Sequence, residues 1–230
     1  TGVQTCALPI WIELDGGTLI GNSPALPSYG TTVNGYLGGS GLVRGNVVFN
    51  GSSSLLVGSG EVLRFDADVS NHGSMTIDGG ELRFLAGFDN HAAIVGPPAV
   101  PAGRMSIENG GTVRFAETLT NNGVISNAHG ATNIYGAIDN AGDIVVARDT
   151  VATFYDTVNN TGTITVKPGG NALFLSDLMF IGLGSLELGV DTTDPTGSSA
   201  QISVGGVATL GGTLQITLDG GMNRDRKSVV

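Results

Sequence analysis

Three stretches of the chain read Leu119-Thr120-Asn121-Asn122-Gly123, Ile138-Asp139-Asn140-Ala141-Gly142 and Val158-Asn159-Asn160-Thr161-Gly162. Each stretch has an apolar residue two positions before an asparagine and a glycine two positions after it. The apolar-x-Asn pattern recurs at spacings of 19 to 21 residues, apart from one spacing of 31. A fixed period of this kind is typical of repeat proteins, in which each unit buries its apolar face only against its neighbours. The asparagines of the pattern are Asn50, Asn71, Asn90, Asn121, Asn140 and Asn160.

A second, apolar column keeps the same period four residues before each pattern. Short alternating runs such as Leu82-Arg83-Phe84 put apolar side chains on one face and a charge on the other, which is the period of a half-buried strand. Glycine-containing turn signals separate these runs, and no stretch has a helical period. The sequence therefore predicts an all-β fold, a parallel β-helix (solenoid) with coils of about 19–21 residues stacked about 4.8 Å apart. The second column comprises Phe65, Phe84, Phe115, Ile134, Phe154 and Phe174.

The period divides the chain into regions. The long spacing contains the proline-rich run Gly96-Pro97-Pro98-Ala99-Val100-Pro101, which predicts a loop insertion near 93–104 between two coils. Residues 41–188 are expected to form the β-helix repeats, and residues 11–40, rich in glycine and serine, irregular N-terminal coils. Residues 189–224 are expected to form a polar loop and a terminal strand pair.

Both ends of the chain read as foreign sequence. Back-translated in one consistent frame, residues 1–10 (TGVQTCALPI) and residues 225–230 (DRKSVV) match the two adapters commonly used in short-read sequencing. We therefore expect these segments to be adapter-derived, and the native part to span about 11–224. The only cysteine, Cys6, and the clustered basic residues Arg226 and Lys227 fall within them.

Composition excludes several partners. The chain has a formal net charge of −10 and no native cluster of basic residues, which argues against nucleic acid and against an anionic membrane surface. No apolar run approaches the roughly 20 residues that span a bilayer. Hydrophobic residues make up 40% of the chain, which is too many for a disordered one.

The stretch 202–220 (ISVGGVATLGGTLQITLDG) resembles the end of the solenoid in autotransporter passengers and in exported proteins of the PEP-CTERM type. The preceding coils resemble the repeats of the same proteins. This resemblance implies a bacterial protein that is secreted or held at the cell surface, with partners among extracellular glycans or other surface proteins.

Stacked coils bring equivalent residues together, so each polar column is a candidate for binding or catalysis. The asparagines are expected to form a structural ladder, with side-chain amides hydrogen-bonded from coil to coil. Arg64, Arg83 and Arg114 share a column and could hold a carboxylated or sulfated glycan. Tyr135 and Tyr155 form a stacked pair that could serve as a sugar platform. Pairing with neighbouring acids for the arginines, and ordinary cross-strand packing for the tyrosines, are the more common reasons for such columns.

His72 and His91 are equivalent residues one coil apart, but two ligands are too few for a zinc site, and we expect neither metal nor cofactor. An enzyme of the polysaccharide lyase or glycosidase type is the alternative, since Asp66, Asp68 and Asp89 could supply a carboxylate pair. These acids are not distinguished from other surface acids, and no motif for nucleophilic catalysis is present. The sequence therefore favours a non-catalytic structural or adhesive scaffold with weak glycan binding.

Overall fold

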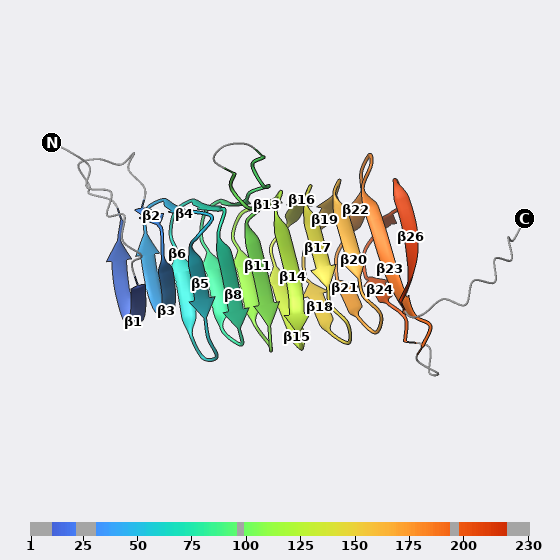
Figure 1. The fold of residues 1–230 in the computed structure, drawn as a ribbon, viewed down its shortest axis with the longest axis horizontal. Coiled ribbons are helices and arrows are strands. Elements are labelled where there is room, and N and C mark those ends of the chain that lie inside the picture. The colour runs from blue at the N-terminus through green and yellow to red at the C-terminus, as the bar shows by residue number, and fades with distance from the viewer. Residues whose placement is uncertain (1–10, 22–30, 96–98, 194–197, 220–230) are drawn as a thin grey trace, which may run out of the picture.

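The computed structural model describes residues 11–21, 31–95, 99–193 and 198–219, so both adapter-like ends lie outside the described residues. The described chain contains strands and turns but no helix, and therefore no helix long and apolar enough to cross a membrane. All pairings between the named strands are parallel. Strands follow one another in stacked coils that form a β-solenoid of about eight turns (Figure 1). The predicted fold class is confirmed.

Each coil contributes strands to three faces. Strands β1 (Trp11–Ile20) and β3 (Tyr36–Arg44) are long enough to run across the first two faces. Face A continues through β5 (Ser54–Val57), β8 (Ser74–Asp78), β11 (Arg104–Glu108), β14 (Val124–His129), β17 (Asp143–Val146), β20 (Thr163–Val166), β23 (Ser185–Asp191) and β26 (Thr213–Asp219).

Face B continues through β6 (Val62–Phe65), β9 (Glu81–Phe84), β12 (Thr112–Phe115), β15 (Ala131–Tyr135), β18 (Val151–Phe154), β21 (Asn171–Phe174) and β24 (Gln201–Val204). Face C consists of short strands, β2 (Thr31–Val33), β4 (Val47–Phe49), β7 (Val69–Asn71), β10 (Phe88–Asn90), β13 (Leu119–Asn121), β16 (Ile138–Asn140), β19 (Val158–Asn160), β22 (Leu178–Phe180) and β25 (Ala208–Thr209).

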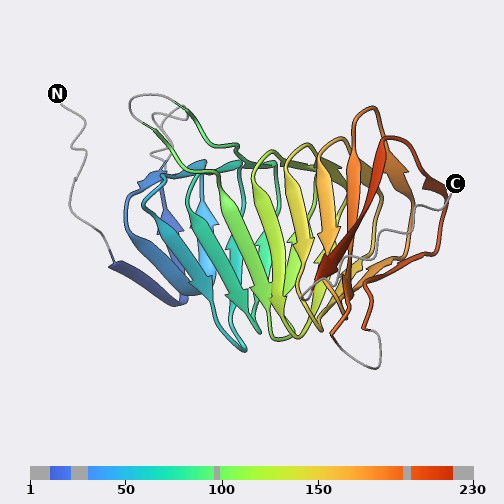
Figure 2. The same cartoon turned by 45° about the vertical axis from the view of Figure 1, so that its right-hand side comes forward.

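The core is one continuous column of apolar side chains inside the coils. Strand residues alternate between buried and solvent-facing, as in Val113 and Phe115 of β12, because successive side chains of a strand point to opposite faces. The buried apolar cluster extends from Val33 to Phe180 without a break between coils. Figure 2 shows the three-sided stack around this core.

The N-terminal region is more regular than its composition suggests. Strand β1 pairs in parallel with β3, with Ile12 opposite Leu37 and a single irregularity between Asp15 and Gly17. The expected boundary at residue 40 falls inside β3. Stacking between Trp11 and Tyr36, whose ring centroids are 4.0 Å apart, continues the solenoid into its first described coil.

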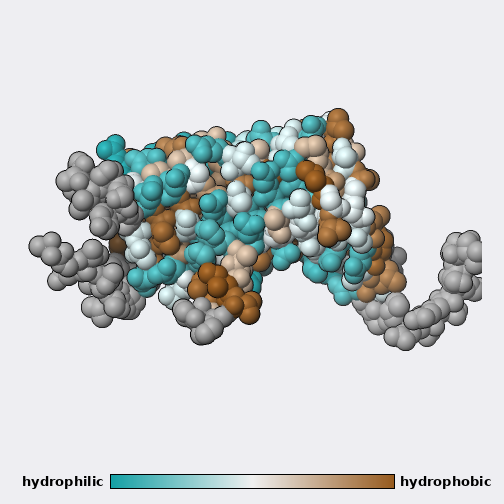
Figure 3. Space-filling view, turned by 90° about the horizontal axis from the view of Figure 1, so that it is seen from above, coloured by the Kyte–Doolittle hydropathy of each residue, from teal (hydrophilic) through white to brown (hydrophobic). Residues whose placement is uncertain are grey.

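The C-terminal region forms a further coil and not a strand pair. Strands β24, β25 and β26 each pair with the strand below on a different face, β21, β22 and β23 respectively. Leu214, Ile216 and Leu218 of β26 continue inward columns but are 47% to 64% exposed, since no described strand lies beyond them. Figure 3 shows hydrophobic residues gathered at this end of the molecule.

The proline-rich insertion leaves the stack after β10 and returns before β11 (Figure 1). Its two described arms are joined by an antiparallel bridge between Ile94 and Val100. Strand β11 then resumes the normal register, with Met105 opposite Met75 of β8. The insertion therefore extends outward without disturbing the coil that follows it.

Two predicted column members are wrong. Phe49, not Asn50, lies opposite Asn71, because Val47 and Phe49 are the residues that β4 buries. Asn50 follows the strand, at the corner, where its Nδ2 donates to Oδ1 of Asn34. Three apolar residues in succession, Val47 to Phe49, allowed two registers in the sequence, and burial of the phenylalanine selects the other one.

The second error concerns one neighbour of Ile134, which lies opposite Phe154 as predicted but opposite Val113 and not Phe115 in the preceding coil. Gly136 instead lies next to Phe115, with a positive φ of 106°. A Cβ atom on Gly136 would be 2.5 Å from the carbonyl oxygen of Phe115. The phenylalanine column is therefore interrupted, with stacked rings at Phe65, Phe84 and Phe115 and again at Phe154 and Phe174.

Candidate functional site

The asparagine column is an interior ladder on face C. The Nδ2 of Asn71 donates to Oδ1 of Asn90 at 2.9 Å, and the same bond joins Asn90 to Asn121 at 2.7 Å. It continues from Asn121 to Asn140 and from Asn140 to Asn160, each at 2.6 Å. All five side chains are buried. Because the amides satisfy one another inside the protein, the ladder is structural and offers nothing to a ligand.

The ladder is flanked by aromatic residues in the same column. Phe49 lies opposite Asn71 at one end, and Phe180 opposite Asn160 at the other. Glycines two positions after the asparagines let the coils approach closely: a Cβ on Gly123 would be 2.7 Å from Nδ2 of Asn90. The Asn-x-Gly spacing in the sequence thus has a steric cause.

The predicted arginine and tyrosine residues form one outward column on face B. Arg64 lies opposite Arg83, Arg83 opposite Arg114, and Arg114 opposite Tyr135. Tyr155 follows Tyr135, and their ring centroids are 3.9 Å apart. We name this set, Arg64, Arg83, Arg114, Tyr135 and Tyr155, the Arg-Tyr column. The sequence indicated two separate features, and the shifted register at Ile134 joins them.

Glu81 is the carboxylate of this surface. Its Oε2 accepts a hydrogen bond from Nη2 of Arg83 at 2.8 Å, and its Oε1 accepts one from Nε of Arg114 at 2.5 Å. The bond from Arg83, followed by that from Arg114, lowers the pKa of Glu81, while partial burial acts in the opposite direction. Glu81 therefore remains ionised at neutral pH and holds two arginines in fixed positions.

Both ring faces of Tyr135 are covered. The guanidinium carbon of Arg114 lies 3.8 Å from the ring centroid, and the ring of Tyr155 lies parallel on the other side. A sugar platform requires a free ring face. Tyr135 therefore cannot act as the sugar platform that was one interpretation of the sequence, and it positions Arg114 instead.

No protein-family model, curated protein or solved structure matches this chain.

The two histidines of the corner are stacked face to face. The ring centroids of His72 and His91 are 4.3 Å apart and the rings are inclined by 8°. The lone pairs of a ring lie in its plane, so those of two stacked rings lie in separate, nearly parallel planes and do not converge on one ion. No cluster of three or more His, Cys, Asp or Glu side chains suited to a metal occurs among the described residues.

The aspartates considered for catalysis have structural contacts. Oδ1 of Asp66 accepts a hydrogen bond from the backbone N–H of Gly45 at 3.0 Å, and Oδ1 of Asp68 accepts one from Gly87 at 3.1 Å. Each bond links one coil to an adjacent coil. Asp68 and Asp89 line a shallow groove of about 400 Å³ on face C together with Ser70. Of the three aspartates considered, Asp68 and Asp89 are the pair that lines this groove.

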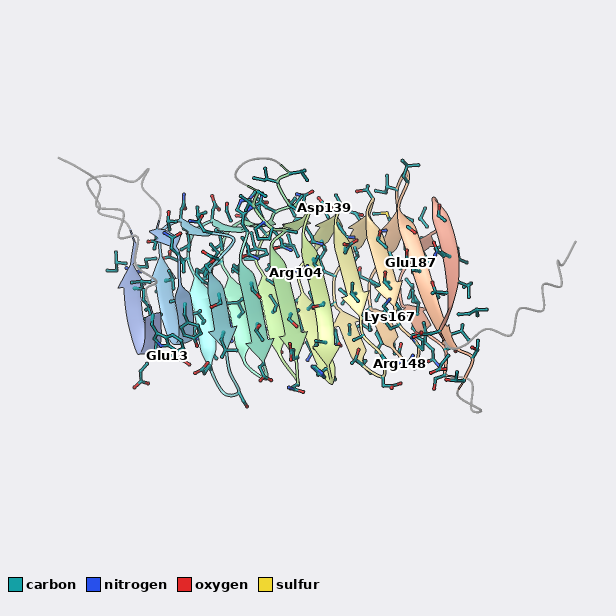
Figure 4. The ribbon with its side chains drawn as sticks, viewed as in Figure 1. Glu13, Arg104, Asp139, Arg148, Lys167 and Glu187 are labelled. Carbon is teal, nitrogen blue, oxygen red and sulfur yellow. The ribbon has the colours of Figure 1, made fainter. Side chains whose placement is uncertain are left out.

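Arg148 makes the longest-range ion pairs of the described chain, and sequence reasoning missed it. Its Nη1 lies 2.6 Å from Oδ2 of Asp191, and its Nη2 lies 2.8 Å from Oδ2 of Asp219. These partners belong to β23 and β26, the last two strands of face A. Figure 4 shows Arg148 at the edge of the stack close to these strands. Arg148 therefore ties the last coil to earlier ones.

Proposed function

We propose that the chain is a structural or adhesive scaffold module of a bacterial protein that is secreted or exposed at the cell surface. The observation that supports this most is the asparagine ladder, which runs through five consecutive coils inside one apolar core. Such a core specifies a rigid stack and repeats the same outer surface at every coil. A scaffold requires a rigid, extended shape and an outer surface that repeats along its length.

The proposal treats the chain as non-catalytic. Asp66 and Asp68 accept backbone hydrogen bonds between coils, which is a sufficient structural reason for their presence. A glycosidase needs two carboxylates with opposed protonation states. Asp68, one of the two carboxylates in the groove on face C, already accepts the backbone N–H of Gly87.

The adhesive part of the proposal depends on the Arg-Tyr column. Arginine forks suit carboxylates and sulfates of extracellular glycans, and a flat face of parallel strands could also contact another surface protein. The net charge of −10 disfavours nucleic acid as a partner. Export agrees with the resemblance to autotransporter passengers and PEP-CTERM proteins, and it is tested by locating the protein in fractionated cells.

One preparation tests scaffold against enzyme. The purified chain is incubated with acidic and neutral polysaccharides, and reducing ends and unsaturated uronates are measured, with glycan binding measured in parallel. The scaffold proposal predicts no product with any substrate. Product formation that disappears in Asp68→Asn, but not in Asp139→Asn on a different coil, would favour a carbohydrate-active enzyme.

A further inference from the structure

The coil repeat creates two equivalent gaps between the arginines of face B. One gap lies between Arg83 and Arg114, and the other between Arg64 and Arg83, each about one strand spacing of 4.8 Å wide. In the neighbouring outward column of face B, Glu81 lies opposite Val62 of one adjacent coil and opposite Thr112 of the other. Glu81 thus flanks both gaps, but its carboxylate is bonded across the gap to Arg114 and has no bond to Arg64.

The first gap is filled by the protein itself. The two carboxylate oxygens of Glu81 are shared between Arg83 and Arg114, so that a single carboxylate bridges two coils. This contact shows that arginines in adjacent coils of this face can grip one carboxylate. The grip is reinforced by Tyr135, which lies against the guanidinium of Arg114.

The second gap has no carboxylate of its own. Val62 occupies the position equivalent to Glu81, and Arg64 is exposed with no ion pair among the described residues. The nearest acids in sequence are used elsewhere: Asp66 pairs with Arg44, and Glu61 accepts the backbone N–H of Gly58. A carboxylate from outside would find in this gap two arginines of adjacent coils, Arg64 without an ion pair among the described residues and Arg83 with its Nη2 already bonded to Glu81.

We propose that the gap between Arg64 and Arg83 is a binding site for the carboxylate of an acidic polysaccharide, with Glu81 as its internal counterpart one coil away. The inference rests on the adhesive role proposed above and names its ligand class. Polar side chains continue along the same face, with Thr112, Asn133 and Thr153 in one outward column, and could hydrogen-bond the hydroxyls of the sugar chain. The chain of sugars would run along the solenoid axis.

The acidic net charge of the protein limits the ligand. Long-range repulsion opposes a dense polyanion, whereas a bidentate arginine contact acts at short range and tolerates a single carboxylate. Affinity should therefore be modest for each site, and it should fall as salt screens the exposed arginines.

The test measures binding of polygalacturonate, dextran sulfate and neutral dextran to the full chain at two salt concentrations. Val62→Glu supplies the second gap with an internal carboxylate, and Val62→Gln is its neutral control of equal size. Arg64→Gln removes one wall of the site, and Arg104→Gln is its control, an exposed arginine on face A (Figure 4). Glu81→Gln vacates the first gap. Circular dichroism melting verifies that each variant folds.

We expect wild type to bind polygalacturonate and not dextran. Val62→Glu and Arg64→Gln should each weaken this binding about tenfold, a difference of about 1.4 kcal/mol, while both controls bind like wild type. Glu81→Gln should bind several times more tightly, because it offers two gaps.

Polygalacturonate binding that is equal in Val62→Glu and Val62→Gln would overturn the site and leave glycan adhesion through another face. Binding of dextran sulfate but not polygalacturonate would overturn the carboxylate assignment. Absence of acidic-glycan binding by both wild type and Glu81→Gln would overturn the site together with glycan adhesion, leaving a purely structural scaffold.

Discussion

The side-chain amide of Asn121 donates to that of Asn140 at 2.6 Å, with both side chains buried between adjacent coils. Asn140 in turn donates to Asn160, and Asn121 accepts from Asn90. Each amide is thus both donor and acceptor within one chain of hydrogen bonds. Removing one member leaves a donor and an acceptor without partners in a place that water does not reach.

The first prediction follows from this relationship. Asn140→Ala should lower the free energy of unfolding by about 1–3 kcal/mol, because two buried partners lose a hydrogen bond. Asn122→Ala, which removes an exposed asparagine next to the ladder, should leave the free energy of unfolding nearly unchanged. Urea denaturation of the three proteins measures the difference. Equal destabilisation by the two variants would contradict a special role for the ladder.

The second prediction concerns Gly136. Its φ of 106° and its closeness to Phe115 leave no space for a side chain. Gly136→Ala should therefore destabilise the protein by about 1–3 kcal/mol through strain, and by more if Phe115 is displaced. Gly110 has a φ of 87° with no atom within 4 Å of its missing Cβ, so Gly110→Ala separates backbone strain from the clash. Thermal melting should rank Gly136→Ala clearly below Gly110→Ala.

The third prediction concerns pH. Burial first, and then the neighbouring charge of His91, lower the pKa of His72 below its ordinary value of 6.5. The unfolded chain therefore binds the proton more readily than the folded one, and stability should fall as pH drops from about 7.5 to about 5. In His72→Asn this part of the pH dependence should disappear. Unfolding curves at several pH values check the sign, and a loss of stability on raising the pH would refute it.

The fourth prediction concerns the last coil. Arg148 pairs with Asp191 and Asp219, so Arg148→Met, which retains an unbranched side chain but removes the charge, should loosen β26 without unfolding the stack. Hydrogen exchange followed by mass spectrometry should show faster exchange in β26 and unchanged exchange in β14. Arg104→Met, on the same side of the molecule, is the control. Uniform acceleration in every coil would mean that the ion pairs stabilise the whole fold.

Much of the fold could be predicted because equivalent positions of stacked coils carry similar residues, so the length of a coil appears as a period in the sequence. Asn90, Asn121 and Asn140 occupy the predicted column since a buried amide tolerates few substitutes. The register errors have a common cause. At Phe49 and Ile134, a shift of one or two residues at a corner keeps the period of the sequence but changes which residues of adjacent coils lie opposite one another. The irregularity between Ile107 and Glu108 changes the pairing in the same way within a strand.

The candidate site was predicted only in parts. Arg64, Arg83 and Arg114 were recognised as a column, but their junction with Tyr135 needed the shifted register that only the structure provides. The bridging role of Glu81 depends on side-chain direction, which spacing does not encode. Arg148 and Asp219 lie 71 residues apart, and nothing in the local sequence connects them.

The most direct test of the stacked-coil account is a disulfide between Thr76 and Ser106 in a Cys6→Ser background. These residues are 30 positions apart but lie opposite one another on face A, on either side of the proline-rich insertion. Parallel strands about 4.8 Å apart allow a disulfide between such positions.

With both residues replaced by cysteine, mild oxidation should give a monomeric cross-linked chain that stays folded. Replacing Thr76 and Ser126 instead puts the thiols two coils apart, about 9.6 Å by strand spacing, and these thiols should remain free. Peptide mapping of the oxidised proteins by mass spectrometry distinguishes the two results. Free thiols at positions 76 and 106, or equal cross-linking of both cysteine pairs, would contradict the strand register and with it the proposed scaffold.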